Sequence, residues 1–106
     1  MAISKTEVIR KKQTRGAILY LLYISQTAPM MLKTIELSML PENPHIGAEL
    51  LPQINWLLDR GYITQAKDEE KTEQRRRGDV LVRITDKGQD ALEGTKPDYG
   101  LIVPDA

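Results

Sequence analysis

The chain has 106 residues, 15 basic and 15 acidic side chains and no cysteine, so its formal net charge is zero. This length suits one domain around one hydrophobic core. The absence of cysteine excludes disulfides and thiolate chemistry and favours an intracellular, cytoplasmic protein. The polar, basic N-terminus does not resemble a secretion signal, and the longest apolar stretch, residues 17–24, is too short to span a bilayer, so we expect no membrane partner.

The charges are unevenly distributed along the chain. Residues 1–16 carry a basic cluster, residues 75–77 are three consecutive arginines, and residues 89–106 are mainly acidic. A net charge of zero argues against DNA binding, which normally depends on excess positive charge to displace counterions from phosphates. Because a local basic surface can serve the same purpose, the distribution keeps DNA binding open.

Three helices are predicted in the first part of the chain. Ser4 and Glu7 form a capping box that starts a helix over about residues 5–26, and a second, shorter helix covers residues 32–40. A third helix is predicted over residues 46–60, followed by Gly61 as its terminator. Pro52 lies inside this third segment, so the regular helix either starts near Leu50 or is kinked at the proline.

The pattern then changes from helical to extended. Residues 62–66 and 80–85 are predicted strands that form a hairpin around a highly charged loop, residues 67–79. Thr85 can cap a last helix over residues 86–93, with Gly94 as its stop. We expect residues 1–94 to form the domain and residues 95–106 to be an extended or disordered tail unless a partner holds it. The fold class is therefore α+β, mostly helical.

Two motifs carry a resemblance to a known superfamily. They are the helix exit Leu57-Leu58-Asp59-Arg60-Gly61-Tyr62-Ile63 and the helix entry Ile84-Thr85-Asp86-Lys87-Gly88. With the order of elements, they resemble the winged helix-turn-helix of the PadR and MarR regulators over residues 15–94. PadR-like proteins often carry a proline at the position of Pro52. Small winged-helix proteins of Mu-like prophages are also similar.

The resemblance implies a winged helix, that is, a three-helix bundle with a two-stranded hairpin wing and a short C-terminal helix, acting in transcription regulation on double-stranded DNA. The chain departs from those families in two ways. It lacks their long C-terminal dimerisation helices, and the connection over residues 41–45 is longer than a minimal turn.

In such a fold the third helix enters the major groove. With its apolar stripe turned inward, we expect Glu49, Pro52, Gln53 and Trp56 to face outward, with Asn55, Asp59 and Arg60 at the margin of this set. Gln53 and Asn55 have amides that can pair with adenine. The alternative is an ordinary surface with Trp56 at a protein contact, since Arg60 is the helix's only basic residue.

The remaining DNA-contact candidates are basic. Arg75, Arg76 and Arg77 can grip phosphates or enter a narrow minor groove, although acidic residues in the same loop could neutralise them. Lys33 is also a predicted DNA-binding residue. The first helix offers further candidates for contacts with the DNA backbone, Lys11, Lys12 and Arg15, although these side chains can equally be the solvated exterior of the helix.

No catalytic machinery is predicted. His45 is the only histidine and is expected to be a turn residue, so neither a metal site nor a nucleophilic triad can be assembled, and we expect no enzyme activity and no cofactor. Two functions stay open: a DNA-binding regulator, or a winged helix that serves as a protein-interaction module. As a regulator it is expected to be a homodimer, joined through the first helix, near Tyr20 and Tyr23, or through residues 99–103.

Overall fold

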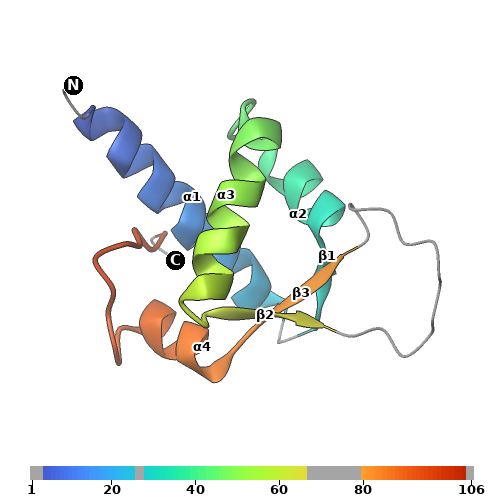
Figure 1. Ribbon diagram of the computed structural model, residues 1–106, viewed down its shortest axis with the longest axis vertical. Helices are drawn as coiled ribbons and strands as arrows, with labels where there is room; N and C mark the ends of the chain where they lie inside the picture. Colours follow the sequence, from blue (N-terminus) through green and yellow to red (C-terminus); the bar gives the residue numbers. More distant parts are fainter. Residues whose placement is uncertain (1–3, 26–27, 67–79, 105–106) are drawn as a thin grey trace.

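The computed structural model describes residues 4–25, 28–66 and 80–104. Over these residues the chain forms four helices and one three-stranded antiparallel sheet (Figure 1). The elements are α1 (Lys5–Ile24), β1 (Met30–Met31), α2 (Leu32–Met39), α3 (Ile46–Asp59), β2 (Ile63–Ala66), β3 (Leu81–Ile84) and α4 (Asp86–Glu93). The predicted α+β, mostly helical class is confirmed.

Helix ends follow the predicted capping residues. The Ser4 hydroxyl accepts a hydrogen bond from the Glu7 amide at 3.3 Å, and the Thr85 hydroxyl accepts one from the Gly88 amide at 3.1 Å. Each bond satisfies an amide that has no partner in the first turn of its helix. Gly61 and Gly94 follow α3 and α4 with φ of 75° and 84°, a left-handed conformation that glycine adopts without a steric penalty.

Helix α3 continues through its proline. It begins at Ile46 and contains Pro52, so the alternative in which the helix starts near Leu50 is wrong. Proline cannot donate to the carbonyl of Ala48, four residues earlier. Because Ala48 and Pro52 both lie on the exposed face of the helix, water can reach that carbonyl.

The sheet has a strand that sequence analysis did not predict. Its order is β1-β3-β2, with Met30 opposite Val82 and Met31 opposite Leu81. The predicted pair of strands is confirmed, because β2 and β3 pair antiparallel, and β1 adds a third strand that was not predicted. Two residues are too few to show the alternation that marks a strand, and β1 forms because the edge of β3 offers unpaired backbone groups. The Leu32 amide extends this pairing by donating to the Val80 carbonyl at 3.0 Å.

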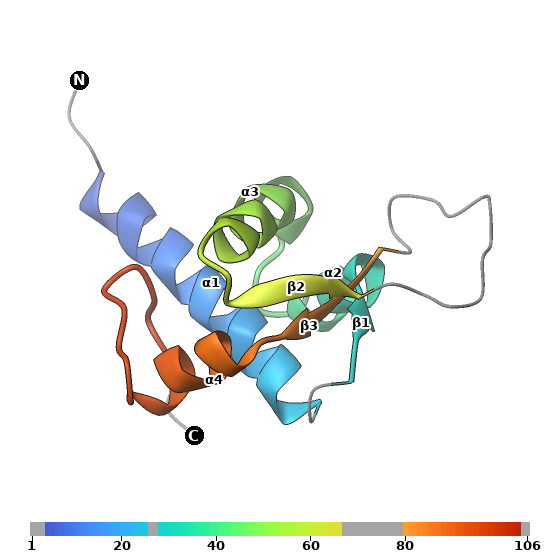
Figure 2. The same ribbon diagram turned by 60° about the horizontal axis from the view of Figure 1, so that its bottom comes forward.

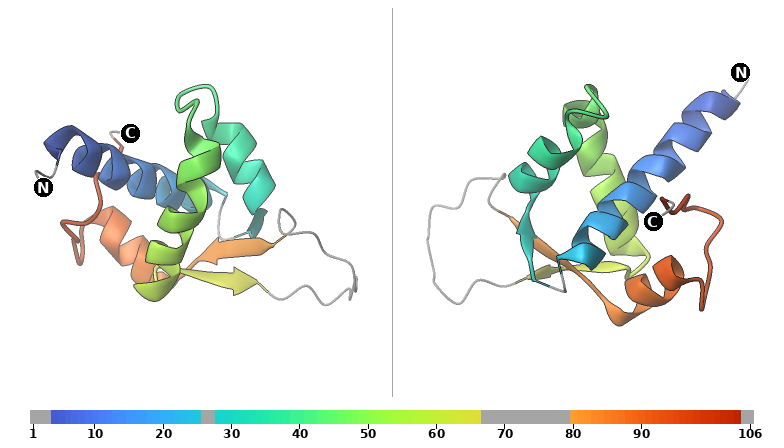
Figure 3. Two further views of the ribbon diagram at one scale, coloured as in Figure 1. Left: turned by 45° about the horizontal axis from the view of Figure 1, so that its top comes forward. Right: turned by 180° about the vertical axis from the view of Figure 1, so that it is seen from behind.

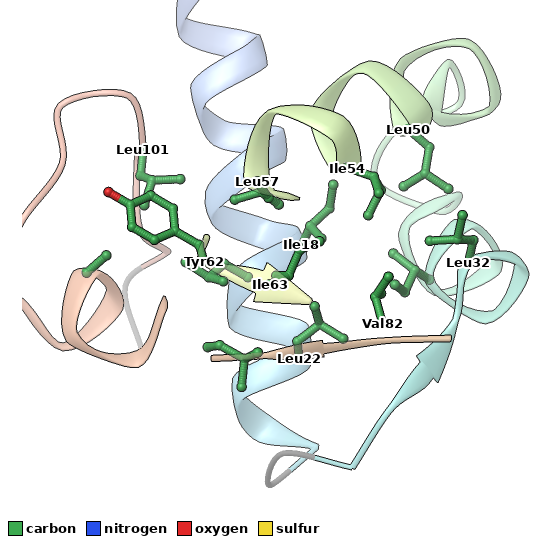
Figure 4. Packing of buried hydrophobic residues seen from close by; sticks show 14 of the residues in the cluster. Ile18, Leu22, Leu32, Leu50, Ile54, Leu57, Tyr62, Ile63, Val82 and Leu101 are labelled. Carbon is green, nitrogen blue, oxygen red and sulfur yellow. The ribbon is translucent and has the colours of Figure 1, made fainter. Parts of the chain in front are cut away.

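The core lies between the helices and one face of the sheet (Figures 2 and 4). Its fully buried side chains come from α1, α2, α3, β2 and β3, and they are Ile18, Leu19, Leu22, Ile35, Ile46, Leu57, Ile63 and Val82. Burial of this aliphatic surface is the main favourable term in folding.

The tail, residues 95–104, packs against its own chain. Leu101 is buried in the same core cluster, and the Ile102 amide donates to the Lys12 carbonyl of α1 at 3.1 Å. The tail is free of helix and strand, as expected, and runs beside the first half of α1 (Figure 3). Leu101 gives the described part of the tail an apolar anchor in the core of its own chain, without a partner.

Candidate nucleic-acid interface

Helix α3 presents one buried face and one exposed face. Ile46, Leu50, Ile54 and Leu57 point into the core. The exposed residues are Gly47, Ala48, Leu51, Pro52, Asn55 and Asp59, which we call the outer face of α3. This face contains no lysine or arginine and one acidic residue, Asp59 at its end, so α3 cannot by itself attract phosphates.

The acidic residue in the first half of α3 is paired. The Glu49 carboxylate forms a salt bridge with the Arg10 guanidinium at 2.9 Å. It also accepts a hydrogen bond from the side-chain amide of Asn43 at 3.0 Å. Its side chain is mostly covered. The Arg10 cation of α1 therefore compensates the negative charge of Glu49, which reduces its repulsion of a phosphate backbone.

Gln53 does not belong to the outer face. It is 5% exposed, and its Oε1 accepts a hydrogen bond from Arg15 Nε at 2.6 Å. The predicted outward orientation is wrong. The sequence did contain the signal: Gln53 lies three residues after Leu50 and four before Leu57, which puts it on the apolar stripe despite its polarity.

Trp56 is half-buried rather than exposed, and it lies at the centre of a cationic cluster. The Cζ atoms of Arg15 and Arg60 lie 4.3 and 4.5 Å from the Trp56 ring centroid. Such contacts are attractive because the ring face carries negative charge density. Burial lowers the pKa of Arg15, and the neighbouring Arg60 lowers it further. Arg15 and Arg60, two of the predicted DNA contacts, therefore pack on an aromatic ring of their own chain.

Asp98 of the tail completes this cluster. Its carboxylate accepts hydrogen bonds from the Tyr62 hydroxyl and, at 2.7 Å, from the Gly100 amide, and it lies 3.4 Å from Arg60 Nη1. The Tyr62 hydrogen bond is the largest influence that lowers the pKa of Asp98. Burial and the same bond raise the pKa of Tyr62 to about 12. Figure 4 shows Tyr62 and Leu101 on facing segments.

Two glycines allow the tail to approach this closely. A Cβ atom on Gly16 of α1 would lie 1.8 Å from the Ile102 carbonyl oxygen, and one on Gly100 would lie 2.4 Å from the Trp56 ring. The Gly100 carbonyl in turn accepts a hydrogen bond from Arg15 at 3.3 Å. Backbone therefore packs directly on the helix and on the ring, which no larger residue permits.

Taken residue by residue, the predicted site divides into two groups. The first group is a cluster of Arg15, Gln53, Trp56 and Arg60. This cluster holds the tail. Asn55, Lys33 and Lys11 are exposed, and Lys12 is half-buried. Arg75, Arg76 and Arg77 lie outside the described residues. Asp98 and Tyr62 were missed, and the only local signal was the Asp98-Tyr99-Gly100 sequence, which is typical of a turn closed by its aspartate.

The base of the hairpin lies next to the start of α2. Lys33 follows Leu32, whose amide donates to Val80, the residue that precedes β3. Arg83 on β3 is also exposed, opposite Thr64 of β2. Lys33 and Arg83 are the described basic residues nearest in sequence or pairing to the ends of residues 67–79, which lie outside the described residues.

A groove of about 920 Å³ lies between α1, the connection from α2 to α3, and the end of the tail. Arg10, Thr14, Tyr20 and Met39 are among the residues that line it, as is His45. His45 precedes α3, is exposed and is a turn residue, as predicted. Within residues 4–25, 28–66 and 80–104, His, Asp and Glu side chains form no group of three that could hold a metal ion.

No helix in the described parts of the chain has the length and apolarity needed to cross a membrane. In comparisons with known proteins, no family model, no curated protein and no solved structure matches this chain.

Proposed function

We propose that this protein is a winged-helix DNA-binding protein that acts in transcription regulation. The order α1-β1-α2-α3-β2-β3, with β1 on the outer edge of the β2–β3 hairpin, is compatible with that fold. The observation that carries the proposal is the uncovered outer face of α3. The tail packs against the flank of this helix, at Trp56, and leaves the outer face free.

Phosphate attraction is assigned to groups outside α3. Arg75, Arg76 and Arg77 are the strongest candidates, because adjacent guanidinium groups form bidentate bonds with phosphates. Lys33 would add a contact at the start of α2. Arg15 and Arg60 contribute little in this proposal, since both are held by Trp56 and by tail oxygens.

The test is a titration of labelled random-sequence duplex DNA, followed by fluorescence anisotropy at rising salt. We expect binding that weakens steeply with salt, and a slope smaller by up to about 1.8 in Arg75→Ala/Arg77→Ala, since each lost phosphate contact removes about 0.9. Lys5→Ala/Lys96→Ala removes the same charge at other exposed sites and should leave the slope unchanged. Absence of binding at low salt would overturn the proposal.

A protein-interaction module is the second candidate. It is favoured by the exposed leucines of α2, of the residue after it, and of α3, because Leu37, Leu40 and Leu51 are 57%, 45% and 46% exposed. Exposed apolar side chains are more typical of protein contacts than of phosphate contacts. This function predicts that the wild-type protein binds no duplex even at low salt, so the same titration separates the two candidates.

The regulator is proposed to act as a homodimer, because two-fold related domains can read two half-sites on DNA. Tyr23 is a poor candidate for the dimer interface, since its hydroxyl already donates a hydrogen bond to Glu93 of α4 at 2.8 Å. Tyr99 is 93% exposed and is the better candidate. Sedimentation of the wild type and Tyr99→Ser, with and without DNA, tests this: the proposal requires a dimer that the substitution weakens.

A further inference from the structure

The first half of the outer face of α3 is free of charge. It presents Gly47, Ala48, Leu51 and Pro52, and Asn55 follows one turn later. The four base pairs present different groups in the major groove. Guanine is read by arginine or lysine, cytosine by a carboxylate, adenine by asparagine or glutamine, and the thymine methyl by apolar side chains. The outer face from Gly47 to Asn55 therefore lacks the arginine, lysine and carboxylate groups that read guanine and cytosine, and holds groups that read adenine and thymine.

Resting on the DNA-binding function proposed above, we propose that α3 reads A·T base pairs. Asn55 would bond bidentately to an adenine, and Ala48, Leu51 and Pro52 would contact the methyl groups of nearby thymines. The ligand class is thus an A·T-rich duplex, bound through its major groove.

The spacing of these side chains suits neighbouring base pairs. Leu51 and Asn55 lie four residues apart, which is about 6 Å along a helix axis at about 1.5 Å per residue. Base pairs are stacked about 3.4 Å apart along each strand, so the two side chains span about two steps. Ala48, three residues before Leu51, continues the same face by a further step.

The first half of α3 can also approach the groove floor closely. Gly47 has no side chain, and a Cβ atom there would meet only the Glu36 carboxylate, at 3.7 Å. Glu49 is neutralised by Arg10. Asp59 lies 12 residues beyond Gly47, about 18 Å along the axis. Base contacts come mainly from the N-terminal residues of such a helix, here Gly47, Ala48 and Leu51, whereas Asp59 is the last residue of α3 and lies one turn, about 6 Å, beyond Asn55.

Of the two amides predicted to read adenine, only Asn55 is available. Gln53 is buried with its oxygen bonded to Arg15, whereas Asn55 is exposed. Specificity for adenine would therefore depend on one residue, and specificity for thymine on methyl contacts. This makes the two readouts separable by experiment.

The experiment compares two duplexes of equal length, one A·T-rich and one G·C-rich, by competition at moderate salt. We expect the wild type to prefer the A·T-rich duplex by about tenfold or more, and Asn55→Ala to lose about tenfold of that preference. Replacing thymine by uracil removes only the methyl and should weaken binding by about fourfold for each contacted methyl. Leu51→Ala should reduce the effect of this replacement by the share of one contacted methyl, because Ala48 and Pro52 still contact the others.

Matched controls come from α1. Gln13→Ala removes an exposed amide and Ile24→Ala trims an exposed apolar residue, both away from the outer face, and neither should change the preference. Equal, salt-dependent affinity for the two duplexes would overturn this inference and leave the proposed function intact. An A·T preference that survives both Asn55→Ala and uracil would also overturn it, since the arginine loop would then be reading a narrow minor groove. No binding to any duplex would overturn the proposed function itself.

Discussion

The Arg15 guanidinium lies over the Trp56 ring, with its Cζ 4.3 Å from the ring centroid, and this contact joins α1 to α3. Arg15 also donates to Gln53 of α3 and to the Gly100 carbonyl of the tail. One side chain therefore links three segments that are distant in sequence. A residue that sequence analysis assigns to DNA acts in the structure as an internal tie, and the first two predictions follow from it.

Replacing Trp56 should loosen the tail as well as α3. Trp56→Ala removes a half-buried ring that contacts Arg15, Arg60 and Gly100, and we expect it to lower the free energy of unfolding by about 2–3 kcal/mol. Urea denaturation followed by circular dichroism measures this. Ile24→Ala, at a side chain that is 54% exposed, should cost less than about 0.5 kcal/mol. If Trp56→Ala and the wild type had the same free energy of unfolding, the contacts of Trp56 with Arg15, Arg60 and Gly100 would not stabilise the fold as inferred.

A methyl group on Gly16 should displace the tail. Its Cβ would lie 1.8 Å from the Ile102 carbonyl oxygen, which is backbone, so Gly16→Ala should cost about 1–3 kcal/mol. Hydrogen exchange should also show that the Ile102 amide, bonded to Lys12, loses protection.

Gly47→Ala is the matched control for this change. Gly47 is also helical, but a Cβ there would meet only the Glu36 carboxylate, at an ordinary contact distance of 3.7 Å, so alanine should stabilise the protein by about 0.4–1 kcal/mol. A Gly16→Ala protein with undiminished protection at Ile102 would refute the close packing of tail and helix.

Stability should depend on the ionisation of Asp98 and Tyr62. The pKa of Asp98 is lowered in the folded state, so its contribution is present above the ordinary carboxyl pKa and is lost as the pH falls through the lower, folded value. Asp98→Asn should therefore reduce the loss of stability below about pH 4. Denaturation of the wild type and Asp98→Asn between pH 2 and pH 7 measures the difference. If the free energy of unfolding of both proteins changed with pH in the same way, the proposed role of Asp98 in holding the tail would be contradicted.

The pKa of Tyr62 is raised to about 12, so its contribution is complete below the ordinary tyrosine pKa and is lost as the pH rises toward 12. Tyr62→Phe keeps the ring and removes the hydroxyl. We expect the wild type to lose more stability than this variant between about pH 10 and 12. Tyrosinate absorbance during titration provides a second readout, and an ordinary titration of Tyr62 would contradict its bond to Asp98.

Thr85 should contribute more to the free energy of unfolding than an ordinary helix cap does. Its hydroxyl accepts from the Gly88 amide and donates to the Gly61 carbonyl at 2.6 Å, so it joins α4 to the turn after α3. Thr85→Ala should cost about 1–2 kcal/mol, and Thr85→Ser should recover most of it. Ser4→Ala, at the exposed start of α1, should cost about 0.5 kcal/mol. Thermal denaturation of the three variants checks this order.

Local patterns predicted most of the elements. Capping by Ser4 and Thr85, the stop at Gly94 and the apolar spacing of α1 and α3 are determined within a few residues, and each agrees with the structure to within two residues at either end. Strand β1 could not be predicted, because Met30 and Met31 are extended only through their pairing with β3. The path of α3 through Pro52 was left open for a similar reason, since it depends on which face of the helix reaches water.

Composition, periodicity and helix caps act over short distances, and they were enough to predict the α+β class, most helix ends and the absence of cysteine chemistry. Which polar residues can reach a partner depends on contacts between distant segments. Arg15 and Arg60 bond to Gly100 and Asp98 of the tail, which lie 85 and 38 residues away in the chain, and Arg15 also holds Gln53. The energy of such contacts depends on geometry between distant segments, and no local pattern in either segment records it.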